Sequence, residues 1–313
     1  KTERLIRNSN NIKILKNTLV TTYNFSDHLI ALEDKNVGKP QDNEKPELVL
    51  HKIRTKHTIL ANGHIERFIT FRNNDLPGVM LAASFEKYLN RYGVVPDESP
   101  VIFTNNSSTF SLLKSLTDLG HKPKAYVDIR DQKNIEKQTL ELLEKFNIPF
   151  YPKSEVEGCE GQKEVKKVSI RTKKNQITKI KTSMLCVSGG FNPDIHLFTQ
   201  SKGLLKWDKD YLTFKPDRIF QKTITLGSVS GNFSYEKLLE EVEKKLSEFE
   251  GLNELEVKFE LNGPEKFQIK ELWETKHEKK SLWSKSFIDL QNDVTTKDLR
   301  QAVNEGFNRI EHL

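Results

Sequence analysis

Three short apolar runs of this chain each end in small residues whose chemistry suits nucleotide binding. They are residues 58–61 before Asn62-Gly63, residues 184–187 before Ser188-Gly189-Gly190, and residues 223–226 before Gly227-Ser228. Apolar runs that stop at small, glycine-bearing turns are typical of buried strands. Because glycine lets the backbone approach a pyrophosphate closely where parallel strands end, the three turns together predict a nucleotide site in an α/β protein.

Two histidines lie near these turns. His64 follows the Asn62-Gly63 turn directly, and we predict that it contacts the nucleotide. His196 lies three residues after Pro193 and is a candidate acid or base, but a lone histidine beside a proline turn is commonly structural. We therefore predict no catalytic residue in this chain.

Residues 101–130 have the pattern of a βαβ unit. An apolar strand at 101–104 is followed by a helix face of Phe110, Leu112, Leu113, Leu116 and Leu119, and then by a strand that ends at Asp128. Asp128 is where a ribose-binding carboxylate would lie in a dinucleotide-binding unit. However, the turn at 104–109 contains no glycine, so the backbone is not expected to approach a pyrophosphate there. We therefore expect Asp128 to be a capping or surface residue.

The two cysteines, Cys159 and Cys186, lie far apart and form no CxxC pair. This spacing predicts neither a disulfide framework nor a zinc or iron–sulfur site. Cys186 lies in an apolar strand and is interpreted as a small core residue. A reducing, cytoplasmic compartment fits these cysteines.

Hydrophobic periodicity and turn residues predict most of the remaining elements. Strands are expected at 12–15, 17–23, 28–32 and 48–55, helices at 79–92, 134–146 and 235–249, a hairpin at 165–171 and 176–182, and a last helix at 296–306. Thr295 is the predicted N-cap of that last helix, with Asp298 near its positive end.

At 313 residues the chain has room for two domains, each with its own core. The net charge of +6 is spread, with lysines among nearly as many carboxylates, and this does not favour nucleic acid. No apolar run reaches the roughly 18 residues of a membrane span. Because the chain begins at Lys1 and ends at Leu313 in a helical pattern, we expect it to be an internal piece of a longer polypeptide.

Four segments resemble the α-subunit family of heterotetrameric sarcosine oxidase, in the order of that family. They are ANGHIERFITFRNNDLPGVMLAASFEKYLNRYG at 61–93, TNNSSTF at 104–110, VSGGFNPDIHL at 187–197 and SFIDLQNDVTTKDLRQAVNEGFNRIEH at 286–312. The last segment is the most specific, because related amine-oxidising subunits carry iron–sulfur cysteines there. This chain has Leu290, Gln291, Asn292 and Asp293 instead, so no cluster and no other metal is expected.

The resemblance implies an α/β fold with two nested Rossmann-like nucleotide-binding domains of the FAD/NAD-linked reductase type, followed by the start of a small helical domain. The first domain would comprise residues 1–95 and 186–250 and the inserted second domain residues 96–185. A linker at 251–280 would lead to the helical domain at 281–313.

The family also implies that NAD is bound in the first domain. The expected cofactor-binding residues are Ala61, Asn62, Gly63, His64, Gly227 and Ser228. Asn62 departs from the usual Ala-Thr-Gly pattern, although asparagine tolerates left-handed geometry. FAD would lie in the β subunit, FMN at the boundary of the α and β subunits, and tetrahydrofolate in a domain after Leu313.

The function implied is that of one subunit of a flavin-dependent oxidase of CH–NH donors with oxygen as acceptor. The complex would demethylate sarcosine to glycine, giving formaldehyde or methylenetetrahydrofolate and hydrogen peroxide, and this segment would bind NAD and dock the β, γ and δ subunits. Two alternatives remain open. One is an α-type subunit of another amine, opine or proline oxidase, and the other is a stand-alone pyridine-nucleotide reductase.

Overall fold

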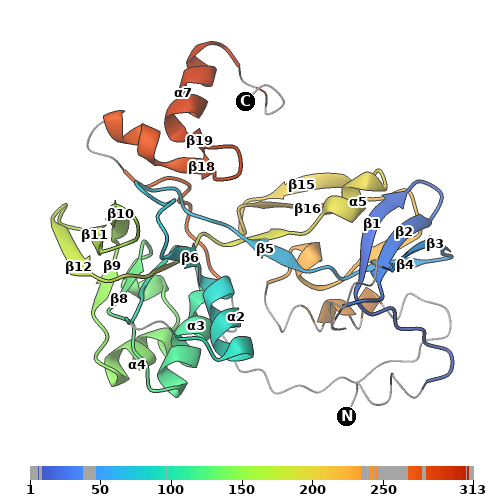
Figure 1. Cartoon of the computed structure of the whole chain (residues 1–313), viewed down its shortest axis with the longest axis horizontal. Coiled ribbons are helices and arrows are strands. Elements are labelled where there is room, and N and C mark those ends of the chain that lie inside the picture. Colours follow the sequence, from blue (N-terminus) through green and yellow to red (C-terminus); the bar gives the residue numbers. More distant parts are fainter. Residues whose placement is uncertain are drawn as a thin grey trace.

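The computed structural model describes residue 6, residues 9–37, 47–95, 98–233, 238, 240–242, 244–245, 267–276 and 280–307, and residue 309. No helix within these residues is long and apolar enough to cross a membrane. The described part forms two α/β units and a smaller unit near the carboxyl terminus (Figure 1).

A five-stranded parallel sheet is the centre of one α/β unit, at the lower left of Figure 1. Its strands, in spatial order, are β6 (Val79–Leu81), β13 (Leu185–Ser188), β7 (Val101–Thr104), β8 (Ala125–Asp128) and β9 (Phe150–Pro152). Its helices are α2 (Ala82–Tyr92), α3 (Thr109–Asp118) and α4 (Lys137–Lys145), with the short 3-10 helix η1 (Gln132–Asn134) before α4. Parallel strands joined through helices make this a Rossmann-like unit.

Both faces of this sheet are buried, which explains why β7, β8 and β13 are continuous apolar runs. One face packs against the three helices. The other face packs against an antiparallel sheet of β10 (Glu155–Glu160), β11 (Lys167–Arg171) and β12 (Ile177–Lys181). Cys159 and Cys186 are both buried free thiols, which confirms Cys186 as a core residue.

The predicted helix face in this unit is confirmed for all but one residue. Phe110, Leu112, Leu113 and Leu116 are buried on α3, whereas Leu119 is 56% exposed. Leu119 follows the last turn of the helix as its C-cap, so its side chain leaves the apolar stripe. The predicted helix at 79–92 begins only at Ala82, because residues 79–81 form β6 beside β13.

The second α/β unit surrounds a short parallel pair, β4 (Thr58–Leu60) and β17 (Thr223–Thr225). Its other elements are the antiparallel sheet β1 (Thr18–Asn24), β2 (His28–Asp34) and β3 (Leu48–Arg54), the hairpin β15 (Leu204–Asp208) and β16 (Thr213–Arg218), α5 (His196–Gln200) and the 3-10 helix η2 (Gly227–Ser230). The strand predicted at 12–15 does not form. The Trp207 and Phe214 rings pack on each other with their centroids 5.0 Å apart and remain about half exposed.

Two antiparallel strands join the α/β units. They are β5 (His64–Glu66), by which the chain leaves the unit of β4, and β14 (Phe191–Pro193), by which it returns. The Rossmann-like unit of the five-stranded sheet is therefore inserted between two adjacent strands of the other, which is the nested arrangement expected from the sequence. The boundaries at 95/96 and 185/186 stay a prediction, and the inserted sheet also takes in β6 and all of β13.

The carboxyl-terminal unit contains η3 (Lys280–Lys285), the hairpin β18 (Phe287–Asp289) and β19 (Val294–Thr295), and α7 (Thr296–Asn304). The Thr295 side chain accepts from the Asp298 N–H, while the Asp298 carboxylate accepts from the Thr295 N–H at 2.9 Å. This reciprocal cap confirms the predicted start of the helix. The predicted linker at 251–280 lies largely outside the described residues, as does most of the predicted helix at 235–249, of which 238, 240–242 and 244–245 are helical.

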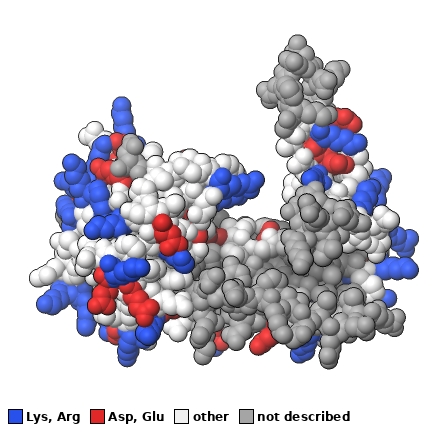
Figure 2. Space-filling model, turned by 90° about the horizontal axis from the view of Figure 1, so that it is seen from below, with Lys and Arg blue, Asp and Glu red and all other residues white. Residues whose placement is uncertain are grey.

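Charged side chains of both signs share the surface. On the face shown in Figure 2, lysines and arginines are most numerous over the inserted unit, and carboxylates lie among them. This mixture matches the spread expected from the sequence.

Candidate functional site

The ends of β4 and β17 bring two of the three predicted turns together. The strands are parallel, and Leu60 pairs with Thr225, so both chains leave the ladder at the same edge. Gly63 has a φ of +90° and Gly227 a φ of +81°, conformations that glycine adopts without strain. Five of the six predicted cofactor residues lie in these two turns, and the sixth, His64, begins β5.

A side-chain hydrogen bond fixes the first turn. The Asn62 amide donates to the Asp194 carbonyl at 2.7 Å, and the Asp194 N–H donates to the Gly63 carbonyl at 3.0 Å. Asn62 itself does not have a positive φ. Its amide therefore ties this turn to the chain after β14, and the tolerance for left-handed geometry considered for Asn62 is not used.

The glycines of the three turns differ in the space around them. Among the described residues, a Cβ added to Gly63 would meet no atom within 4 Å, and one at Gly227 would meet only a Leu238 methyl at 3.5 Å. By contrast, a Cβ at Gly189 would lie 2.7 Å from the Phe68 carbonyl oxygen, and one at Gly190 would lie 2.5 Å from Ile269. The chain itself fills the turn at Gly189-Gly190. Of the three turns, only those at Gly63 and Gly227 have space for a ligand phosphate that no described residue fills.

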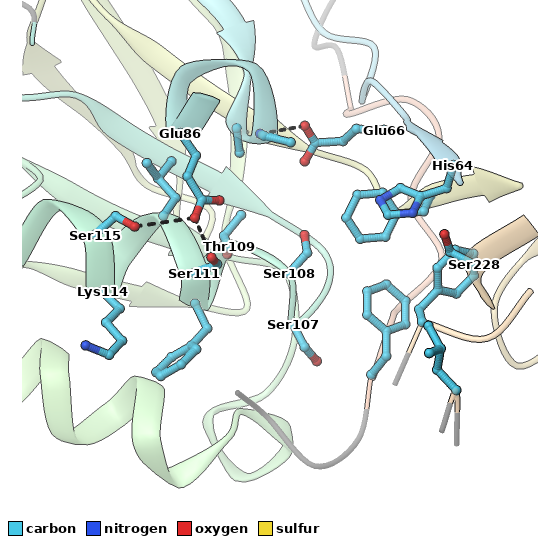
Figure 3. A pocket seen from close by; sticks show the side chains of 18 of the residues that line it. His64, Glu66, Glu86, Ser107, Ser108, Thr109, Ser111, Lys114, Ser115 and Ser228 are labelled. Carbon is cyan, nitrogen blue, oxygen red and sulfur yellow. Dashed lines mark hydrogen bonds between the residues drawn. The ribbon is translucent and has the colours of Figure 1, made fainter. Parts of the chain in front are cut away.

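A cavity of about 610 Å³ lies beside these two open turns, between the α/β units. His64 and Ser228 line it from the unit of β4 and β17, and the amino-terminal half of α2 and one face of α3 line it from the inserted unit (Figure 3). The other four predicted residues lie in the turns that lead to it. Cavities of this size commonly hold small molecules.

Aromatic rings form one side of the cavity. The His64 ring lies 4.1 Å from that of Phe191, and Phe233 and Phe267 lie 5.6 and 5.7 Å from Phe191. Burial lowers the pKa of His64, so its imidazole is neutral near pH 7. A planar ligand group would find ring faces here against which to stack.

Glu66 is the residue of this site that the sequence did not reveal. It lines the same cavity, and its Oε2 accepts a hydrogen bond of 2.8 Å from the Ala83 N–H in the first turn of α2. Burial raises the pKa of Glu66 to about 7, although the Ser188 hydroxyl and the Ala83 N–H oppose this rise. The only sequence signal was alternation along one strand, since His64 and Glu66 share a face of β5.

We expect the Glu66→Gln variant to be more stable than the unaltered protein at pH 8, with little gain at pH 4.5. The carboxyl's pKa is about 7 in the folded protein against an ordinary 4.5, so the folded state holds the extra proton between these values. The unfolding free energy therefore falls as pH rises through this window. The gain in unfolding free energy of Glu66→Gln at pH 8 is at most about 3 kcal/mol. Solvent screening reduces this gain to about 1–2 kcal/mol.

Urea unfolding at the two pH values measures this effect. Glu141→Gln, at an exposed position of α4, is the control and should show no pH-dependent difference. An equal gain for Glu66→Gln at both pH values would contradict the raised pKa.

The turn between β7 and α3, where a dinucleotide would lie in the inserted unit, is covered by the chain itself. The Ser107 N–H donates to the Gln268 carbonyl at 3.0 Å, and the Gln268 N–H donates back to the Ser107 hydroxyl at 2.8 Å. The Lys270 N–H donates to the Asn105 carbonyl at 2.8 Å. The missing glycines led us to expect that this turn does not approach a pyrophosphate. The hydrogen bonds add a second reason, because polar groups of the turn are already paired with Gln268 and Lys270.

Asp128 is fully buried, so the expectation that it is a surface residue is wrong, whereas its carboxylate does cap the backbone by accepting from the Arg130 N–H at 2.8 Å. Its carboxylate accepts three side-chain hydrogen bonds from Arg130, at 3.1 and 3.2 Å from Nε and at 2.8 Å from Nη2. Burial alone would lower the pKa of Arg130, but the Asp128 carboxylate raises it above its usual value. Arg130 also donates to the Asn106 carbonyl at 3.1 Å, and thus ties the end of β8 to the covered turn.

The remaining candidate, His196, lies apart from this cavity. It is exposed at the first residue of α5 and lines a separate hollow with Trp207 and Trp273. Within the described ranges, no group of three or more histidine, cysteine or acidic side chains is placed to hold a metal ion.

Comparison with known proteins places this geometry in context. Residues 283–313 match the family model described as the sarcosine oxidase A3 domain. The chain is 29% identical over 315 residues to the sarcosine oxidase subunit alpha of Rhizobium meliloti, covering 98% of this chain and 30% of that protein. It is 26% identical over 328 residues to that of Corynebacterium sp. strain U-96, covering 100% of this chain and 33% of that protein. The chain thus spans about a third of the length of these relatives.

Solved structures show the same fold. The L-proline dehydrogenase of P. horikoshii superposes with a TM-score of 0.55 at 19% identity, over 97% of this chain and 55% of that chain. A bacillithiol disulfide reductase from Bacillus cereus superposes with a TM-score of 0.50 at 11% identity, over 73% of this chain and 67% of that chain. The predicted nested Rossmann-like fold is confirmed, as is the resemblance to the sarcosine oxidase α subunit.

Proposed function

We propose that this chain, which resembles sarcosine oxidase α subunits over its whole length, binds NAD at the ends of β4 and β17 as part of an oxidoreductase complex. The observation that supports this most is the pairing of two open, positive-φ glycine turns at Gly63 and Gly227 beside a cavity of about 610 Å³. The Asn62 and Gly63 N–H groups have no acceptor among the described residues and are available to phosphate oxygens. The residues present therefore fit a dinucleotide.

The complex would oxidise the N-methyl amine of sarcosine. The proposed overall reaction consumes sarcosine, oxygen and water and yields glycine, formaldehyde and hydrogen peroxide, with methylenetetrahydrofolate formed when tetrahydrofolate takes the one-carbon unit. FAD and FMN would supply the redox chemistry in the complex. This chain would contribute NAD binding and contacts to the β, γ and δ subunits.

The cysteines bear on the alternative of a stand-alone pyridine-nucleotide reductase. A disulfide reductase needs a reactive pair of cysteines, whereas Cys159 and Cys186 lie in different elements and burial raises the pKa of both thiols. This disfavours that kind of stand-alone reductase. Another amine or proline oxidase would share the same scaffold, and peroxide production by the purified complex on each amine would identify the substrate.

Replacing Gly63 by Val tests the nucleotide site. A valine side chain would occupy the open space and force a β-branched residue to a φ of +90°, so we expect NAD affinity to fall at least tenfold. The measurement is the NAD content of the complete natural polypeptide, purified with its partner subunits and dialysed.

Gly306→Val is a matched control for backbone strain. Gly306 also has a positive φ, of +94°, with no atom of the described residues within 4 Å of an added Cβ, but it follows α7 in the carboxyl-terminal unit, whose described residues do not line the cavity. This control should retain NAD. Full retention of NAD by Gly63→Val would contradict the proposed site.

A further inference from the structure

The charged side chains that line the cavity are mainly acidic. Glu66, Glu86 and Asp118 face it, and Lys114 is the sole lysine or arginine among the described residues of its lining. The Lys114 Nζ lies 2.5 Å from the Asp118 Oδ2, so the charge of Lys114 is already paired. A cavity with acidic groups and ring faces suits a positively charged aromatic ring, which interacts favourably with both.

The three carboxylates are not equivalent. Glu86 accepts hydrogen bonds from the Ser111 and Ser115 hydroxyls on α3, and Asp118 is paired with Lys114. Glu66 lies nearer the open turns and accepts a hydrogen bond from the Ala83 N–H at 2.8 Å. Figure 3 shows Glu66 on the side of the cavity nearest His64, and Glu86 farther away.

The strand geometry sets the reach of Glu66. His64 follows Gly63 directly, and Glu66 follows two residues later on the same face of β5, about 7 Å further along the strand. A ligand with its phosphates at Gly63 would pass His64 and place its next ring at the level of Glu66. Since the Phe191 ring packs on the His64 ring there, tilted by 57°, the ligand ring would have aromatic side chains on one side and the carboxyl at its edge.

We propose that Glu66 makes this site selective for the oxidised, positively charged nicotinamide ring over the neutral reduced ring. This inference rests on the proposed binding of NAD at Gly63 and Gly227. An ionised Glu66 stabilises the cationic ring by charge attraction, whereas it offers the neutral ring no such attraction. The chain would then hold NAD mainly in its oxidised form.

Proton release gives a second readout. A bound cationic ring favours the ionised carboxylate, so oxidised NAD should displace a proton from Glu66 near pH 7. The titratable or charged groups around Glu66 are His64 on β5, Glu86 on α2, Cys186 on β13, and Lys114 and Asp118 on α3. His64 and Cys186 are neutral there, since burial lowers the pKa of the former and raises that of the latter.

The experiment compares affinities for NAD⁺ and NADH in the complete natural polypeptide with its partner subunits, after removal of bound nucleotide. At pH 8 we expect Glu66→Gln to weaken NAD⁺ roughly tenfold or more and to change NADH by less than about twofold. Glu86→Gln, with its carboxylate already engaged by serines, should leave the ratio of the two affinities within about twofold of the unaltered protein. Calorimetry in two buffers should show proton release for NAD⁺ that disappears in Glu66→Gln.

The outcomes separate this inference from the proposed function. If the unaltered protein binds NAD⁺ but Glu66→Gln weakens both forms equally, or neither, the role of Glu66 is wrong and NAD binding stands. If the unaltered protein binds neither form, the proposed function itself fails, and the inference fails with it.

Discussion

The Arg130→Met variant is expected to unfold with a free energy about 3–5 kcal/mol below that of the unaltered protein. Asp128 is 0% exposed and accepts from both Nε and Nη2 of Arg130, and methionine would leave this carboxylate buried without its counter-charge. The carbonyl of Asn106 and the carboxylate of Glu136 would each lose a donor as well.

Urea unfolding followed by circular dichroism measures this loss. Lys153→Met is a suitable control, because Lys153 pairs with Asp131 at the surface and its removal should cost about 1 kcal/mol or less. The double variant Asp128→Asn, Arg130→Met should be more stable than Arg130→Met alone, since it removes the uncompensated charge. A loss below about 1 kcal/mol in Arg130→Met would show that the pair does not stabilise the inserted unit.

Gly78→Ala is expected to be the second severe change, with a loss of about 3–5 kcal/mol. Gly78 has a φ of +103°, and a Cβ there would lie 2.2 Å from the carbonyl oxygen of Ser183. Its own carbonyl accepts from the Leu185 N–H at 2.8 Å, so relief of the overlap would disturb the start of β13 beside β6.

Gly120→Ala separates the overlap from the backbone strain. Its φ of +79° is also positive, but no atom lies within 4 Å of an added Cβ, so only about 1 kcal/mol should be lost. Equal losses in the two variants, measured by the same urea titration, would mean that the contact with Ser183 is not rigid.

The elements predictable from the sequence are those whose signals are local. The helix face of Phe110, Leu112, Leu113 and Leu116 and the cap of Thr295 with Asp298 follow from helical spacing and capping chemistry. Both are confirmed, as is the hairpin of β11 and β12. By contrast, Val79–Leu81 is a strand only because β13 pairs with it from more than 100 residues away, and a three-residue strand has no period that distinguishes it from the helix that follows.

The site was predictable only in part, for a related reason. Glycine turns after apolar strands identified Gly63 and Gly227, and the parallel pairing of β4 with β17 brings them together. The sequence has the same pattern, an apolar strand followed by glycines, at Gly189-Gly190, but there Phe68 and Ile269 fill the space. Packing between residues far apart in the chain cannot be predicted from such a local pattern. Glu66 was missed because a single acidic residue in an alternating strand is normally on a solvated face.

The covered turn of the inserted unit is also a tertiary feature. The lack of glycine at 104–109 predicts that no nucleotide binds there, but it does not predict the cover by Gln268 and Lys270, which lie more than 150 residues further along the chain. Asp128 illustrates the same limit: its position after β8 was evident, whereas its burial depends on Arg130 folding back over it.

An experimental structure of the natural polypeptide, with the proposed partner subunits and bound NAD, would test the central claim most directly. The proposal predicts pyrophosphate oxygens within hydrogen-bond distance of the Asn62 and Gly63 N–H groups, and the nicotinamide ring in the cavity beside Glu66. A nucleotide held instead by the Ser107–Thr109 turn of the inserted unit, with Gln268 displaced, would contradict it.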